Sequence, residues 1–349
     1  MEESSPRLLS FDPKRELAGN AVPPPRDAAT VIVMRTRDAG HQGPLGYAGS
    51  KLEVFCVLRH IKSSFLGGAV VFPGGKVELA DGAAAWAKRS SPPHARARAF
   101  ASGELDAFDA RAIAVAACRE TLEEAAILPT DRLLPAVEVE ALRAELLAAT
   151  RAALAVPGAP ATSAPPLFAD ALARRGLSLD LGALVPWGRW ITPVAEARRF
   201  DARFFLLALP EGQAGLHDDH ETTHSFWASP AVILDRFARG EVFLAPPTTR
   251  ALELLAEAAD LRAAFALADA QVLDPICPVY VPDEPPFLAL PGDPAHDVPD
   301  RRVLGPTRFV LRDGRFISEE PPAHRSTDAP PPSEASRAPG ETYISRRSP

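Results

Sequence analysis

Three glutamates at helical spacing are the residues of this chain best suited to chemistry. Residues 119–124 read Arg-Glu-Thr-Leu-Glu-Glu. In an α-helix, positions i, i+3 and i+4 share a face, so Glu120, Glu123 and Glu124 would point the same way. Like charges at this spacing destabilise a helix by roughly a few tenths of a kcal/mol. A divalent cation such as Mg²⁺, which takes oxygen ligands and is commonly held together with substrate phosphates, would explain that cost. The alternative is a solvated acidic helix face.

The helix that must carry these glutamates can be read from the residues around them. Asp109 is a candidate N-cap, since its side chain can accept a hydrogen bond from the first turn. Val115, Cys118, Leu122 and Ala126 fall on the face opposite the glutamates. We therefore expect one face of the helix to pack into a core and the other to face a site.

A glycine-containing segment lies upstream of this helix. Residues 70–78 read Val-Val-Phe-Pro-Gly-Gly-Lys-Val-Glu, which predicts a short strand that breaks into a tight loop. Gly74 and Gly75 would permit unusual φ angles and a close approach of the backbone to a ligand. Such a segment is an ordinary turn in most proteins, but followed by the acidic helix it is far more specific.

Together the two segments resemble the signature of the Nudix hydrolase family, G-x5-E-x7-R-E-U-x-E-E-x-G-U, where U is a bulky aliphatic residue. Gly75 takes the first glycine, and Asp81 stands in place of the first glutamate. Thr121 takes the first U position, Ala126 replaces the last glycine, and Ile127 is the final U. These departures leave room for a Nudix-fold sensor that binds a nucleotide without cleaving it.

The gap between Asp81 and Arg119 is much longer than the family's seven positions, since residues 82–118 fill it. An insertion here is typical of one branch, the proteins similar to Nudix type 19, which are coenzyme A diphosphatases. Other segments also resemble this branch, and the resemblance covers roughly residues 27–318. These segments are 58–59, 65–75, 190–193, 199–205, 244–248, 290–294 and 310–315.

The resemblance implies a metal site and a reaction. Glu120, Glu123 and Glu124 would bind Mg²⁺ or Mn²⁺, and the carbonyl of Gly75 would add an oxygen ligand. Arg119 would orient a ligating glutamate through a charge-assisted hydrogen bond. The metal would neutralise phosphate charge and lower the pKa of a bound water, which would attack one phosphorus of a diphosphate.

Some members of the family use another glutamate from a loop outside the signature. Glu221 precedes Trp227 by a spacing similar to the family's. It would be a metal ligand or the general base, and the alternative is a solvated acidic loop.

Coenzyme A specificity depends on a motif directly before the glycines, to which Arg59, Phe72 and Gly74 are matched as substrate-binding residues. Ser64 replaces the second arginine of that motif, so Lys62 would have to supply the positive charge for a 3′-phosphate. Lysine does not reproduce the bidentate phosphate contact of arginine. The alternative for Arg59 is a surface charge at a strand end.

The function that the resemblance implies is metal-dependent hydrolysis of coenzyme A or acyl-coenzyme A to 3′,5′-ADP and (acyl-)4′-phosphopantetheine. One alternative is hydrolysis of another nucleoside diphosphate derivative, such as ADP-ribose or NADH. The other is the non-catalytic sensor.

Composition limits the classes of partner and the location. The chain has 349 residues, is 46% hydrophobic and carries a formal net charge of −7, which argues against a dedicated nucleic-acid binder. Its three cysteines are too widely spaced to indicate a disulfide framework. Neither a membrane-spanning segment nor a signal peptide is evident, so we expect a cytoplasmic protein. A homodimer is left open.

The predicted fold is α/β, a Nudix α/β/α sandwich with a mixed sheet and a helical insertion. A flexible lead-in (1–27), a Nudix domain (28–318) and a disordered tail (319–349) are expected. The domain would hold insertions at about 82–108 and 130–182, and the helices of the second insertion would form a cap beside the site for substrate selection or dimerisation. Trp187 and Trp190 would fill the core or stack on an adenine. The further predicted elements are strands at 29–34, 52–58, 190–193 and 204–209, helices at 136–155, 167–175, 230–239 and 248–268, and a hairpin at 308–317.

Overall fold

The computed structural model describes residues 24–37, 51–59, 68–100, 107–155, 167–216 and 222–322. The predicted tail from residue 323 and most of the predicted lead-in fall outside these ranges. Arg26 and Asp27, predicted as lead-in, belong instead to the first strand. Within the described ranges, no helix combines the length and the apolar character needed to cross a membrane.

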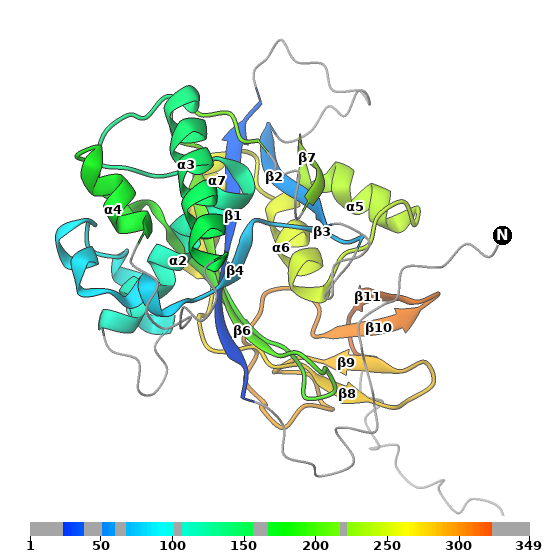
Figure 1. Cartoon of the computed structure of the whole chain (residues 1–349). Helices are drawn as coiled ribbons and strands as arrows, with labels where there is room; N and C mark the ends of the chain where they lie inside the picture. The colour runs from blue at the N-terminus through cyan, green and yellow to red at the C-terminus, as the bar shows by residue number, and fades with distance from the viewer. Residues whose placement is uncertain are drawn as a thin grey trace, which may run out of the picture.

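A seven-stranded sheet forms the centre of the molecule (Figure 1). Its path is β3-β2-β1-β6-β5, with β4 paired to β1 and β7 paired to β2. The pair β1–β6 is parallel and the other pairs are antiparallel, so the sheet is mixed as predicted. The strands are β1 (Arg26–Thr36), β2 (Leu52–Arg59), β3 (Val70–Val71), β4 (Gly74–Lys76), β5 (Val185–Ile191), β6 (Phe200–Ala208) and β7 (Thr222–Ala228).

Both faces of this sheet are covered in its middle, where β1 and β2 have the unbroken apolar runs Val31–Met34 and Val54–Leu58. In β1, Val31 and Val33 enter one core cluster, whereas Ile32 and Met34 enter the other. Successive side chains of a strand point to opposite faces, so this alternation places one core on each side of the sheet. The α/β/α arrangement follows from it.

Helices cover the two faces. The first core contains side chains of α2 (Ala107–Ala125), α3 (Ala136–Leu154) and α4 (Leu167–Arg174). The second contains side chains of α5 (Pro230–Ala238), α6 (Pro246–Ala256) and α7 (Leu261–Ala270).

Two helix boundaries differ from those predicted. The helix α2 begins at Ala107, so Asp109 lies inside its first turn and is not the N-cap. The single helix predicted at 248–268 is two helices, because Asp260 caps a new one by accepting a hydrogen bond from the amide of Ala263 at 2.9 Å.

A second, antiparallel sheet of four strands lies toward the C-terminus, in the order β11-β10-β9-β8 (Figure 1). The predicted hairpin is confirmed at β10–β11, where Asp313 and Gly314 form the turn with φ angles of 46° and 74°. The strands are β8 (Val279–Val281), β9 (Phe287–Ala289), β10 (Arg308–Arg312) and β11 (Arg315–Glu319).

The two predicted insertions pack against each other. Short 3₁₀ helices occupy Leu79–Gly82, Ala84–Lys88 and Ala95–Phe100 in the first, and Leu181–Ala183 follows the second. The rings of Trp86 and Phe168 lie 5.2 Å apart, and the amide of Ser91 donates to the carbonyl of Leu179 at 2.9 Å. The insertions therefore form one layer.

Candidate active site

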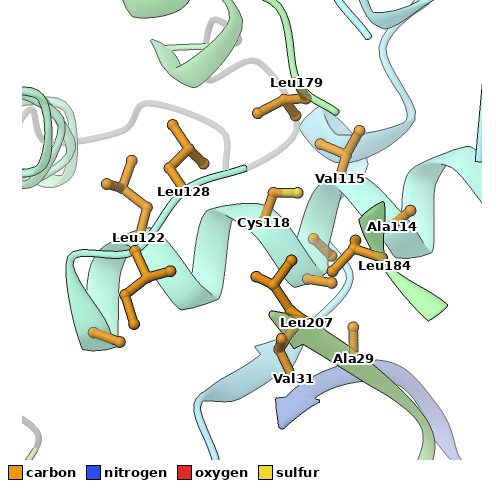
Figure 2. Packing of buried hydrophobic residues seen from close by; sticks show 14 of the residues in the cluster. Ala29, Val31, Ala114, Val115, Cys118, Leu122, Leu128, Leu179, Leu184 and Leu207 are labelled. Carbon is orange, nitrogen blue, oxygen red and sulfur yellow. The ribbon is translucent and has the colours of Figure 1, made fainter. Parts of the chain in front are cut away.

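The helix α2 presents the three glutamates and buries its other face, as predicted. Figure 2 shows Val115, Cys118 and Leu122 on the core side of this helix, beside Leu128, Leu179 and Leu184. Burial raises the pKa of the Cys118 thiol, so this cysteine is a core residue and not a nucleophile. Packing of this face against the core fixes the rotation of α2 about its own axis. It therefore also fixes the direction in which the glutamates point.

The helix ends at the position where the family signature has a glycine. Ala126 takes a left-handed backbone conformation, with a φ of 51°, and its amide donates to the carbonyl of Leu122 at 3.0 Å. Glycine is favoured at such a C′ position because it has no Cβ. The alanine therefore keeps the turn at a conformational cost.

Arg119 is held on both sides. Its Nε and Nη2 donate to the two carboxylate oxygens of Asp81 at 3.0 and 2.9 Å, and its Nη1 donates to Glu120 at 2.8 Å. Nη2 also donates to the carbonyl of Lys76 at 2.8 Å. Burial alone would lower the pKa of Arg119, but the hydrogen bond to Asp81 and the charges of Glu120, Asp81 and Glu123 raise it. The orienting contact predicted between Arg119 and a glutamate is present in this geometry.

The three glutamates differ in their surroundings. Glu124 is buried and accepts a hydrogen bond from the amide of Gly74 at 3.0 Å, whereas Glu123 lies 3.6 Å from Arg119. Burial raises the pKa of Glu123 to about 7, with further increases from the charges of Glu120, Glu78 and Asp81, while Arg119 opposes the shift. A nearby positive charge would stabilise the ionised form of such a carboxylate.

The two glycines are not in a loop but in the short strand β4, which pairs with β1. Neither has a positive φ, so the predicted need for unusual angles is wrong. The close approach to a ligand stays a prediction, but both glycines lie close to other atoms of the protein. A Cβ on Gly75 would lie 2.4 Å from the carboxyl carbon of Glu120, and one on Gly74 would lie 2.4 Å from the carbonyl oxygen of Ala29.

A cavity of about 590 Å³ contains this cluster. The predicted site residues Arg59, Phe72, Gly74 and Gly75 line it, as do Arg119 and the three glutamates. Trp187 and Trp190 are both buried in the core, which was one of their two predicted positions. Trp190 also lines the cavity. Glu221 and Lys62 lie outside the described residues.

Several lining residues had no predicted role. They include Glu78, Thr192, Glu196, Arg198, Pro246, Pro278 and Leu288. The segments around Thr192 and Pro246 had been matched to the family without an assigned function. Nothing in the sequence pointed to Pro278 and Leu288 as cavity residues, because sequence alone does not show which face of a strand meets the cavity.

No described residue of 82–108 or 130–182 lines this cavity. The cap expected beside the site stays a prediction. The second insertion supports α2 from behind, where Leu172 and Leu179 share its core cluster. Arg143 of α3 donates to the carbonyl of Glu123 at 2.8 Å, which satisfies a terminal carbonyl of α2.

The glutamates fit a hard divalent cation by donor type, since they offer several carboxylate oxygens on one cavity wall. In the described part of the chain, no three His, Cys, Asp or Glu side chains converge closely enough to hold a metal as they stand. Two of the glutamates have other partners, since Arg119 donates to Glu120 and the Gly74 amide donates to Glu124. A metal bound by these carboxylates would compete with the two hydrogen bonds.

Comparisons with known proteins identify the family of the chain. The family model described as NUDT19 Nudix domain matches residues 25–255. The chain is 30% identical to the acyl-coenzyme A diphosphatase NUDT19 of Gallus gallus over 64% of its own length and 65% of that protein's. It is 29% identical to the human protein of the same name, over 56% of this chain and 58% of the human one. The chain therefore spans less than two thirds of these two relatives.

A solved structure is also similar. The crystal structure of a NUDIX hydrolase from Alicyclobacillus acidocaldarius superposes with a TM-score of 0.52 and 28% identity, over 70% of this chain and 97% of that chain. The family model alone covers more than half of the sequence. On these grounds the chain belongs to the Nudix hydrolase family, in the group that the NUDT19 domain model describes.

Proposed function

We propose that this protein hydrolyses the diphosphate linkage of coenzyme A or acyl-coenzyme A, with Mg²⁺ or Mn²⁺, to 3′,5′-ADP and (acyl-)4′-phosphopantetheine. The observation that carries the proposal is the position of Glu120, Glu123 and Glu124 on one helix face inside a cavity large enough for a nucleotide. The relatives named acyl-coenzyme A diphosphatase support the substrate class.

Each residue has a role in this proposal. Glu120, Glu123 and Glu124 hold the metal, which supplies charge neutralisation and an activated water. Arg119 keeps Glu120 in place and is itself held by Asp81. The amide of Gly74 orients Glu124 rather than the substrate, since it already donates to that carboxylate. Arg59 binds phosphate, and its buried Nε has no hydrogen-bond partner among the described residues.

The sensor alternative loses its main support. Asp81 makes the bidentate contact to Arg119 despite replacing a glutamate, and Ala126 forms the left-handed turn despite replacing a glycine. At both departures from the signature, the residue present therefore still makes a contact or a turn that holds α2 in place.

Mass spectrometry of the products tests the proposal. Purified protein is incubated with coenzyme A, ADP-ribose and NADH and with Mg²⁺ or Mn²⁺, beside a Glu124→Gln control. We expect 3′,5′-ADP and phosphopantetheine from the native protein and neither from the control. Cleavage of only ADP-ribose or NADH would keep the chemistry and reject the substrate, and binding without cleavage would favour the sensor.

A further inference from the structure

We propose that the C-terminal sheet forms one wall of the active-site cavity and binds the acyl chain of the substrate there. Pro278, directly before β8, and Leu288 of β9 line the same cavity as Glu120 and Glu124. The family model ends at residue 255, so this wall lies beyond the matched segment. The inference rests on the proposed function, because it names the part of the substrate that is held here.

The C-terminal sheet is attached directly to the cavity wall. The amide of Ile276 donates to the carbonyl of Arg189, and the amide of Ile191 donates to the carbonyl of Ile276, both at 2.8 Å. Ile276 is therefore bonded to β5 on either side of Trp190, which itself lines the cavity. Since Pro278 follows two residues later, its position relative to the site is fixed by these bonds.

Leu288 continues the same apolar surface. It is only 2% exposed and belongs to one buried cluster with Phe72, Trp190 and Phe204, all of which line the cavity. Its backbone pairs with Tyr280 of β8, which holds it beside the strand that Pro278 begins. The wall is thus built from residues that lie far apart in the sequence.

The chemistry of this wall suits a hydrocarbon. Ala245, Pro246 and Pro247, at the start of α6, add further apolar lining, and proline has no N–H to donate. Burying a methylene on such a surface is favourable, whereas an adenine would leave its ring nitrogens and amino group without partners there. Because the cavity is shared with the glutamates, the hydrocarbon belongs to the molecule whose diphosphate they engage. An acyl chain on the pantetheine arm meets both conditions.

Binding measurements without turnover test this subsite. The Glu124→Gln protein is titrated in Mg²⁺ with coenzyme A, butanoyl-coenzyme A and octanoyl-coenzyme A by calorimetry. The same titrations are made after adding Leu288→Phe, which narrows the wall, Leu288→Ala, which widens it, or Leu290→Ala. Leu290 is a matched control, since it is fully buried in the same cluster but is absent from the cavity lining.

We expect affinity to rise up to about fourfold per buried methylene. Leu288→Phe should lower the octanoyl-to-free coenzyme A affinity ratio by about tenfold. Leu288→Ala removes apolar contact with the chain and should lower the same ratio, whereas Leu290→Ala should leave it unchanged. Affinity independent of the acyl chain, or equal changes in the ratio for Leu288→Ala and Leu290→Ala, would overturn the inference. Chain-dependent binding with no cleavage by the protein carrying native Glu124 would reject the proposed function and keep the subsite.

Discussion

The guanidinium of Arg119 makes two parallel hydrogen bonds to the carboxylate of Asp81, at 3.0 and 2.9 Å, across the whole insertion that separates them in sequence. Both side chains are buried, Asp81 to 2% and Arg119 to 8% exposure. Removing Asp81 would take two hydrogen bonds from the buried guanidinium of Arg119 and leave Glu120 and Glu123 as its carboxylate partners.

Asp81→Ala should therefore lower the free energy of unfolding by about 3 kcal/mol. Glu145→Ala is the control. Glu145 is another carboxylate paired with arginine, through Arg174 and Arg175, but it lies on the surface. Its loss should cost less than about 1 kcal/mol, because solvent screens an exposed pair. Urea unfolding of both variants measures the difference, and equal losses would contradict the importance given to burial.

Ala126→Gly should stabilise the protein by about 1 kcal/mol, since a left-handed conformation is costly for a residue with a Cβ. Gly176→Ala supplies the reverse experiment. Gly176 has a φ of 63°, and a Cβ there would meet no atom within 4 Å, so only backbone strain changes. Thermal unfolding should show opposite shifts of similar size, and a destabilised Ala126→Gly variant would be incompatible with the strain described.

Gly75→Ala should reduce kcat/KM by about a hundredfold with little loss of stability, because the added methyl displaces the Glu120 carboxylate, a movable side chain. Gly74→Ala meets the carbonyl oxygen of Ala29 and the Cα of Thr30, which are backbone atoms. It should cost roughly 1–3 kcal/mol of stability. Assays of activity and of unfolding on both variants separate the two effects. Full activity in Gly75→Ala would mean that activity does not require the Glu120 carboxylate in its present position.

The raised pKa of Glu123, about 7 in place of 4.5, makes the stability of the metal-free protein depend on pH. The folded state favours the protonated carboxyl, so this group contributes stability below pH 4.5 that is lost as the pH rises through 7. Melting temperatures in EDTA should therefore fall less between pH 5 and 7.5 in Glu123→Gln than in the native protein.

Added Mg²⁺ should oppose the fall in melting temperature of the native protein at high pH, since the cation stabilises the ionised carboxylate of Glu123. At pH 7.5 the native protein should gain more from Mg²⁺ than Glu123→Gln does. An identical pH dependence of both proteins in EDTA would mean that Glu123 is not desolvated as the structure places it.

The sequence predicted those features that depend on local periodicity. The face shared by Glu120 and Glu124 follows from helical spacing, and the turn at Asp313 follows from its glycine neighbour. The break before α7 was missed although Asp260 supplied a capping signal, because the apolar pattern continues past it. The position of Leu288 in the cavity lining was not predicted for another reason, since tertiary packing decides which surface an element covers.

The contact between Asp81 and Arg119 closes residues 82–118 into a loop whose two ends are fixed at the site. Loop-closure entropy grows only with the logarithm of length, so a connection about five times longer costs roughly 1.5 kcal/mol more. That small increment is offset where the inserted residues build their own contacts, as Trp86 does with Phe168. The length of this segment is thus weakly constrained by chain entropy, and in this chain the two halves of the signature meet in space although they are far apart in the sequence.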